Sequence, residues 1–351
     1  MNRHKYLILS VAAAMALSFS SCHTVEQWDN DLYGNFDALW TSVDQHYCFF
    51  GEKDIDWTET GRRYRAAIDP EMSETEFFDL CGDMLCELKD GHVNLSSYFN
   101  TSYYRKWWSD YPQNFNWRLI QEHYLGFDYG SAGGLEYKLL PQNVGYLRYA
   151  SFSYGFSESA LDMILYSFRE SHGLIIDVRD NGGGDLTNVE KMVSHFIDNT
   201  ITAGYIMHKT GPGHDDFSEP FAYSYEPTRG VRWLKPVIVL TNRSTFSAAN
   251  NFVSVMKTLP HVTIVGAVTG GGSGMPATYE IPCGWGVRMS VSPILDPEGN
   301  PTENGISPTT GGEIDMDESQ AADGHDSILD FAIEVLVRNS SQQPAGQLSL
   351  R

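Results

Sequence analysis

Apolar residues in the N-terminal part of the chain recur with the spacing of amphipathic helices. From about Trp28 to Tyr47, and again after Ser73, they stand three or four positions apart. Ser73 and Glu76 also fit a capping box, in which each residue satisfies a backbone amide of the other. Residues 23–97 are therefore predicted to form a helical subdomain.

From Gly145 onward, strand-like and helix-like patterns alternate. Short runs of β-branched and apolar residues predict buried strands at 146–152, 174–178, 237–240 and 262–268. Helical spacing follows three of them, at 157–168, at 189–197 and after Ser247. Because strands that alternate with helices form β-α-β units, we expect residues 145–339 to be an α/β core with a mostly parallel sheet. Residues 340–351, rich in Ser, Gln and Pro, are predicted to be a loose tail.

Residues 98–144 connect these two parts. Aromatic residues are far more frequent between 98 and 117 than in the chain as a whole, where they make up 13%. The preferred interpretation is a satellite hydrophobic cluster under a long loop, and the alternative is the lining of a substrate cleft.

Composition narrows the classes of partner. The chain has 351 residues, of which 42% are hydrophobic, so it can bury a full core. Its formal charge of -21 argues against nucleic acid or an anionic membrane surface as the main partner, since both require clusters of Lys and Arg. The cysteine spacing fits no zinc template, and we expect neither a metal nor a cofactor. Leaving Cys22 aside, four cysteines remain, and the sequence does not choose among their three complete pairings.

Residues 1–22 have the order of a targeting segment. A short basic region with Arg3 and Lys5 precedes an apolar stretch and the small-residue ending Ser20-Ser21-Cys22. This ending resembles a bacterial lipoprotein signal, in which Cys22 becomes the lipidated first residue. The expected location is then the cell envelope of a bacterium, at the outer membrane, with the chain anchored by its lipid and facing the periplasm or the exterior. The alternative is an ordinary secretory signal cleaved nearby.

Ser247 lies between a predicted buried strand and a predicted helix. The start of a helix offers unpaired amides and the positive end of its dipole, which can stabilise negative charge on a substrate oxygen. Alternatively, Ser247 only caps the helix. The glycines 182–184 follow another buried strand. They lack the spacing of a nucleotide-binding loop, but they lie at the same edge of a parallel sheet, where ligands bind. The serine and the glycine turn can therefore face one cleft.

His92 follows the second predicted helix, which ends at Asp90-Gly91. Gly91 suits the left-handed conformation that closes a helix, so His92 would be held by a rigid element. Taken alone, His92 is as readily interpreted as a structural histidine.

Four blocks of the sequence together resemble the serine peptidase family that includes the C-terminal processing (tail-specific) peptidases and the tricorn core protease. They are LKDGHVNL at 88–95, LIIDVRDNGGG at 174–184, VIVLTNRSTFSAANNF at 237–252 and ENGISPT at 303–309. The resemblance is to the tricorn-like branch. It implies a crotonase-like core of ββα type in an α/β (α+β) fold, preceded by the helical subdomain.

The resemblance also implies roles for individual residues. Ser247 matches the nucleophile, and His92 matches the general base. Glu303 matches the acid that orients the base. The amides of Ala248 and of the Gly182-Gly183 turn match the oxyanion hole.

Three departures from the family pattern qualify these roles. Gly272 stands where the processing peptidases have a lysine base, and the last lysine of the chain, Lys257, is nearly three helical turns beyond Ser247. Gly91 stands where a serine precedes the tricorn-type histidine. Glu303 is one residue closer to the next glycine than expected, which leaves Thr302 or another acid as alternatives. The segment 98–144 is also too short for a clear PDZ domain.

The sequence thus predicts a serine endopeptidase that hydrolyses exported or extracellular peptides by a Ser-His-(Glu) mechanism. Its expected partners are a peptide or unfolded protein substrate and, through the lipid on Cys22, a bacterial membrane. The alternative is a catalytically inactive ligand-binding protein with the same fold.

Overall fold

The main sheet contains six strands, in the order β10-β9-β6-β5-β4-β3, in the computed structural model, which describes residues 28–342. Four neighbouring strands are parallel: β5 (Val144–Tyr149), β6 (Leu174–Asp177), β9 (Val237–Thr241) and β10 (Val262–Gly266). Every residue of β6 and β9 is buried, as expected for strands covered by helices on both faces. The predicted α/β class is confirmed.

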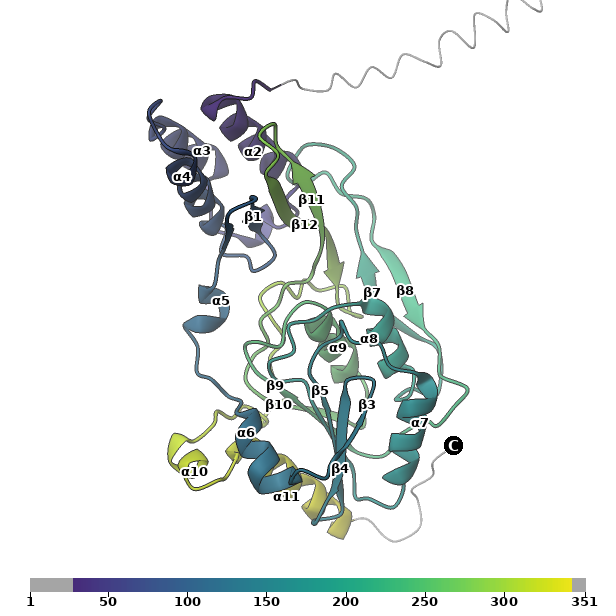
Figure 1. Cartoon of the computed structure of the whole chain (residues 1–351). Helices are drawn as coiled ribbons and strands as arrows, with labels where there is room; N and C mark the ends of the chain where they lie inside the picture. The colour runs from purple at the N-terminus through teal and green to yellow at the C-terminus, as the bar shows by residue number, and fades with distance from the viewer. Residues whose placement is uncertain (1–27, 343–351) are drawn as a thin grey trace, which may run out of the picture.

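Helices cover both faces of this sheet (Figure 1). One hydrophobic cluster joins it to α7 (Glu158–Ser167), α8 (Leu186–Val193) and α9 (Ala248–Lys257). Another cluster joins its opposite face to α6 (Trp117–Ile120) and α11 (Ser327–Gln342). Side chains of successive residues on a strand point to opposite faces, so β9 supplies Val237 and Val239 to the first cluster and Ile238 and Leu240 to the second.

A second sheet links the core to the N-terminal helices. Its strand order is β2-β1-β12-β7-β8, with β11 paired to β12. The strands are β1 (Asn94–Ser96), β2 (Thr101–Tyr103), β7 (Ile201–Ile206), β8 (Phe221–Tyr225), β11 (Gly274–Glu280) and β12 (Gly286–Leu295). Local sequence patterns do not predict this antiparallel sheet, because its strands come from distant parts of the chain.

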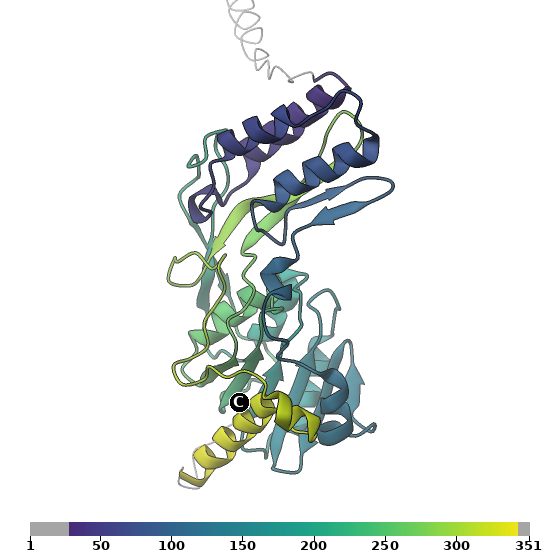
Figure 2. The ribbon, with the colours of Figure 1, turned by 90° about the vertical axis from the view of Figure 1, so that its left-hand side faces the viewer.

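The predicted helical subdomain packs on this second sheet. It contains α2 (Leu32–His46), α3 (Trp57–Ala66), α4 (Glu74–Cys86) and the 3-10 turn η1 (Phe50–Glu52). The capping box of Ser73 and Glu76 is present at the start of α4. A third hydrophobic cluster unites these helices with β1 and β12. Figure 2 shows the three helices at one end of the molecule and α11 at the other.

Residues 98–144 contribute helices and two strands of the main sheet, in addition to connecting the helical subdomain to the core. They form α5 (Lys106–Ser109), α6 and η2 (Gln121–Leu125), and they supply β3 (Gly130–Ala132) and β4 (Leu135–Leu140) as antiparallel strands of the main sheet. At the other end of the chain, α10 (Glu318–Ala322) precedes α11, which runs to Gln342 and so includes the first residues of the predicted loose tail.

The sequence leaves the pairing of the four cysteines open. In the structure, Cys48, Cys81, Cys86 and Cys283 are free thiols.

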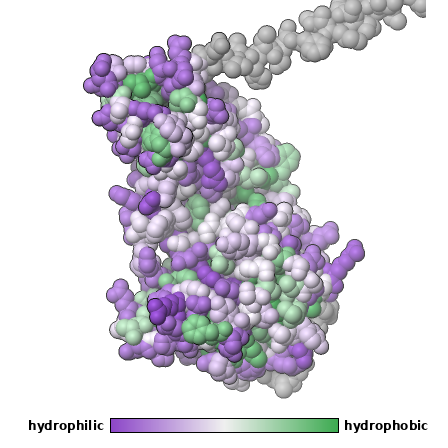
Figure 3. Space-filling view, viewed as in Figure 1, coloured by the Kyte–Doolittle hydropathy of each residue, from purple (hydrophilic) through white to green (hydrophobic). Residues whose placement is uncertain are grey.

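Among residues 28–342, no helix is long and apolar enough to cross a membrane, and no group of His, Cys, Asp and Glu has the arrangement of a metal site. On the face shown in Figure 3, hydrophobic side chains form small groups between hydrophilic ones. Cys22 lies outside the described residues.

Candidate active site

Ser247 occupies a sharp turn between β9 and α9. Its backbone has φ +57° and ψ -122°, in a region that non-glycine residues rarely adopt and that costs about 1–3 kcal/mol. The turn is held on both sides, because the Ser247 amide donates to the carbonyl of Gly271 (2.8 Å) and the Phe246 amide donates to the carbonyl of Asn181 (3.0 Å). The Ser247 hydroxyl does not cap α9. It lies 3.0 Å from Nε2 of His92 instead, which contradicts the helix-cap alternative.

His92 is carried by the loop between α4 and β1 and is only 3% exposed. Its amide donates to Oδ1 of Asp90 (2.7 Å), and the hydroxyl of Tyr47 donates to the other oxygen of the same carboxylate (2.8 Å). The imidazole ring also packs against Phe246, with 4.7 Å between the ring centroids. Backbone and ring are therefore both fixed, as the sequence analysis predicted.

The reason given for Gly91 was wrong. The left-handed residue of this turn is Lys89, with φ +50°, whereas Gly91 is not left-handed. Gly91 is required by space, since a Cβ there would lie 2.5 Å from Nε1 of Trp107 and 3.0 Å from Phe246. A serine at this position, as in the tricorn-type pattern, would collide with both side chains.

Burial controls the protonation of His92. The loss of solvent around the ring lowers its pKa to about 4, assisted by the positive charges of Arg288 and Lys53 and opposed by the carboxylate of Asp90. The imidazole is therefore neutral at pH 7. A hydroxyl 3.0 Å from a neutral imidazole nitrogen can transfer its proton to it, which is the first requirement of a serine nucleophile.

The second ring nitrogen does not face Glu303. Nδ1 of His92 lies 3.3 Å from the hydroxyl of Ser290, a fully buried residue of β12. Glu303 instead accepts from Nζ of Lys53 (3.0 Å) and from the amide of Ser273 (3.0 Å). Burial and the nearby charge of Asp90 outweigh Lys53 and raise the pKa of Glu303 to about 7.

The glycine turn lies against Ser247, as predicted. A Cβ on Gly183 would stand 2.7 Å from Cβ of Ser247 and 2.8 Å from the amide nitrogen of Ala248, and its φ of +96° favours glycine. However, the Gly183 amide donates to Oδ1 of Asn181 (2.9 Å). The amides of Gly182 and Ala248 make no hydrogen bond within residues 28–342, so both are free to donate to a substrate oxygen.

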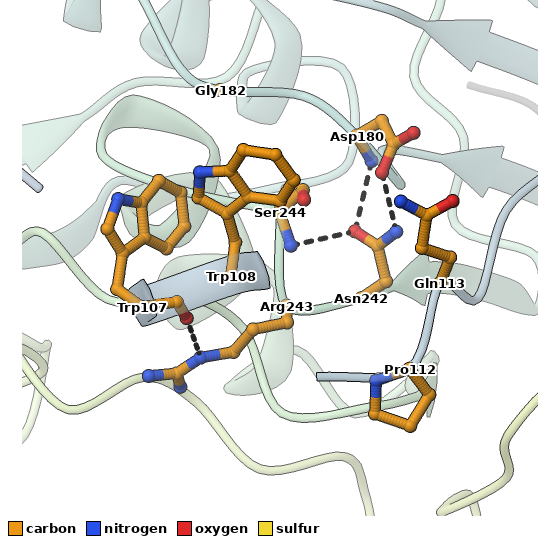
Figure 4. Close-up of a pocket in the computed structure, with 9 residues that line it drawn as sticks. All are labelled: Trp107, Trp108, Pro112, Gln113, Asp180, Gly182, Asn242, Arg243 and Ser244. Carbon is orange, nitrogen blue, oxygen red and sulfur yellow. Dashed lines mark hydrogen bonds between the residues drawn. The ribbon is translucent and has the colours of Figure 1, made fainter. Parts of the chain in front are cut away.

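Two cavities flank the glycine turn. One has a volume of about 290 Å³ and borders Gly184, Ser247 and Ala248, with a mostly aliphatic lining that includes Leu186, Met275, Pro276 and Ile294. The other has a volume of about 310 Å³ and borders Gly182, with Trp107 and Trp108 on one side (Figure 4). These two tryptophans thus line a cavity beside the site, which was the less favoured interpretation of the aromatic segment.

The structure places Lys257 away from the site, as its spacing from Ser247 predicted, and it brings in residues that local patterns do not reveal. Lys257 donates to the carbonyl of Ser307 at the far end of α9 and makes no contact with Ser247. Ser290 and Lys53 were missed because they reach the site from strands and turns that are remote in sequence. Asp90 was noted only as a helix end, although its place two residues before His92 was a usable signal.

Comparisons with known proteins show which proteins this chain resembles. The model of peptidase family S41 matches residues 143–311, and the tricorn protease C1 domain model matches residues 29–86. The crystal structure of a candidate peptidase from Parabacteroides merdae is similar over 90% of this chain and 100% of that chain, with 43% sequence identity and a TM-score of 0.86. Mature CPAF, in a complex with lactacystin, covers 88% of this chain and 99% of its own at 12% identity and a TM-score of 0.66, which shows a shared fold.

A relative that is named for its activity matches a smaller part of this chain. The carboxy-terminal processing protease CtpB of Bacillus subtilis is 28% identical over 176 residues, which are 50% of this chain and 35% of that protein. The match thus spans about a third of that relative's length. From the full-length similarity and the two family matches, the chain belongs to peptidase family S41.

Proposed function

We propose that the chain is a serine peptidase in which Ser247 is the nucleophile and His92 is the general base. The observation that carries this proposal is the 3.0 Å contact between the Ser247 hydroxyl and Nε2 of the buried His92 imidazole. The strained backbone of Ser247 supports it, because such strain is found where a side chain must be presented to a substrate.

The reaction begins when His92 takes the proton from Ser247 as its oxygen attacks the carbonyl carbon of the scissile bond. The negative charge that forms on the carbonyl oxygen is stabilised by the free amides of Gly182 and Ala248. The imidazolium then gives its proton to the leaving amine, and the acyl-enzyme is hydrolysed by water with His92 again as the base.

For Nε2 to accept a proton, Nδ1 must carry the hydrogen of the neutral ring. Ser290 is placed to accept that hydrogen and so to hold the reactive tautomer. We therefore assign the positioning of His92 to Ser290. Glu303 matches the family's acid, but it accepts hydrogen bonds from Lys53 and from the amide of Ser273. Ser273 belongs to the loop beside Ser247.

We further propose that the substrate is a peptide or an unfolded protein outside the cytoplasm. Two observations support this: the cavities that border Ser247 and Gly182 suit side chains of an extended chain, and the sequence has a lipoprotein-like ending at Cys22. Lipidation of Cys22 would be disproved if a Cys22→Ala protein remained bound to the membrane.

A fluorophosphonate probe tests the proposal directly, because only an activated serine reacts with it. Wild type should be labelled and should hydrolyse casein, whereas Ser247→Ala should do neither and should keep its melting temperature. His92→Ala should be nearly as inactive, and the matched variant Lys257→Ala should remain active. An unlabelled, inactive wild type that still binds peptides would support the alternative of a ligand-binding protein.

A further inference from the structure

The cavity beside Gly182 has the chemistry of a cation-binding site. Its volume is about 310 Å³, and we call it the tryptophan cavity. Figure 4 shows the rings of Trp107 and Trp108, from α5, on one side and the carboxylate of Asp180 on the other. The floor between them is polar, with Asn242 and Ser244. An aliphatic side chain would displace water from the carboxylate of Asp180 without replacing its hydrogen bonds, so the lining favours a polar or charged occupant.

Asp180 is held rigidly at the edge of this cavity. Its backbone is left-handed, with φ +56°. The buried side chain of Asn242 fixes it twice, because Nδ2 donates to Oδ1 of Asp180 (2.8 Å) and Oδ1 accepts from the Asp180 amide (3.0 Å). Asp180 is exposed and makes no ion pair within the described part of the chain. Its charge is therefore fixed in position and available to a ligand.

The nearby arginine is already engaged elsewhere. Nε of Arg243 donates to the carbonyl of Trp107 (2.7 Å), and one of its terminal nitrogens donates to the carbonyl of Thr269 (2.9 Å). The guanidinium also lies 4.4 Å from the ring centroid of Tyr111. In Figure 4 it is turned toward α5 and away from Asp180. It fixes the segment that carries the two tryptophans and leaves the carboxylate of Asp180 as the accessible charge.

We propose that the tryptophan cavity binds a lysine or arginine side chain of the peptide substrate, close to the bond that is cleaved. This inference rests on the proposed function, since it places the substrate across Ser247. The faces of indole rings attract cations, and a carboxylate provides a charge-assisted hydrogen bond. The cavity borders Gly182, whose amide is a proposed oxyanion donor, so its occupant must be within a few residues of the scissile bond.

Cleavage mapping tests the specificity. A library of peptides from digested proteins is treated with the enzyme, and the cleaved bonds are identified by mass spectrometry. Wild type should cleave preferentially where Lys or Arg lies within a few residues of the bond. Asp180→Asn should lose this preference, because it keeps the hydrogen bond to Asn242 and tolerates the left-handed backbone but removes the charge. Asp110→Asn removes the same charge from the exposed end of α5, outside the cavity, and should keep the preference.

Binding separates a failure of this inference from a failure of the proposed function. In the Ser247→Ala background, the peptide Ala-Ala-Lys-Ala-Ala should bind about tenfold more tightly than its norleucine counterpart, measured by tryptophan fluorescence. Adding Asp180→Asn should remove that difference. Equal affinity for the two peptides, or cleavage sites without Lys or Arg enrichment, would overturn the proposal even if the enzyme is active. A protein that prefers the lysine peptide but cleaves nothing would overturn the proposed function alone.

Discussion

Replacing Ser290 by Ala removes the hydroxyl that faces Nδ1 of His92 at 3.3 Å. Ser290 is fully buried and His92 is 3% exposed, so no water replaces the lost acceptor. A buried N–H group left without a partner costs about 1–3 kcal/mol. If that cost applies to the reactive tautomer, kcat/KM should fall by about 5- to 150-fold, since about 1.4 kcal/mol corresponds to a factor of ten.

The pH profile distinguishes positioning from a general structural effect. Ser290 stabilises the imidazolium more than the neutral ring, because a charged donor makes the stronger hydrogen bond. Without it, the pKa of His92 should fall further, and the acidic limb of kcat/KM should move to lower pH. A fluorogenic peptide assayed from pH 3 to 8 measures both the rate and the limb, and thermal unfolding reports stability.

Ser292 provides a matched control on the same strand. Its hydroxyl lies 3.2 Å from Nδ1 of a different histidine, His208. Ser292→Ala should therefore lose a similar contact without changing kcat/KM. The assignment is refuted if Ser290→Ala is within twofold of Ser292→Ala while Glu303→Gln loses activity by orders of magnitude, because the orienting role would then belong to Glu303.

Three further predictions follow from the site. The pKa of His92 of about 4 predicts that kcat/KM rises through pH 4 and is level from about pH 5 to 7; a limb near pH 6.5 would contradict the burial argument. Gly183→Ala should abolish fluorophosphonate labelling, because the new methyl group collides with the serine turn, whereas Gly155→Ala adds a methyl group in open space and should have no effect. Lys53→Met should leave the buried Glu303 without an ion-pair partner and destabilise the protein by about 3–5 kcal/mol in chemical denaturation at pH 9, well above the pKa of about 7 that Glu303 has beside Lys53. The loss should be smaller at pH 6, and adding Glu303→Gln should restore stability.

Local sequence patterns were sufficient for the central elements. The apolar run at 237–240 and the glycines at 182–184 predicted where Ser247 and the turn beside it would lie, because the ends of parallel strands meet at one edge of a sheet. The capping box and helical spacing likewise predicted the helix before His92. These features depend on neighbouring residues only, which is why periodicity revealed them.

The partners of His92 and Glu303 could not be found in this way. Ser290 is 198 positions from His92, and the contact depends on the register in which β12 pairs with β1. Lys53 is 250 positions from Glu303. Such registers are set by tertiary packing, and local periodicity does not contain them. The sequence could therefore place Glu303 near the site through a family resemblance, but it could not show that this carboxylate pairs with a lysine.

The site is a contact between two separately packed parts of the chain. Ser247 belongs to the turn that precedes α9, in the cluster of the main sheet, whereas His92 lies between the helices and the second sheet. Two contacts that local sequence patterns do not reveal hold the site in place, since β12 brings Ser290 to His92 and the Lys53–Glu303 pair links the end of η1 to the loop beside Ser247. The 3.0 Å distance between Ser247 and His92 therefore depends on how these parts dock as well as on the two residues themselves. Weakening the Ser290–His92 contact or the Lys53–Glu303 pair should lower activity before it unfolds the protein, because a misplacement of about 1 Å is enough to impair proton transfer.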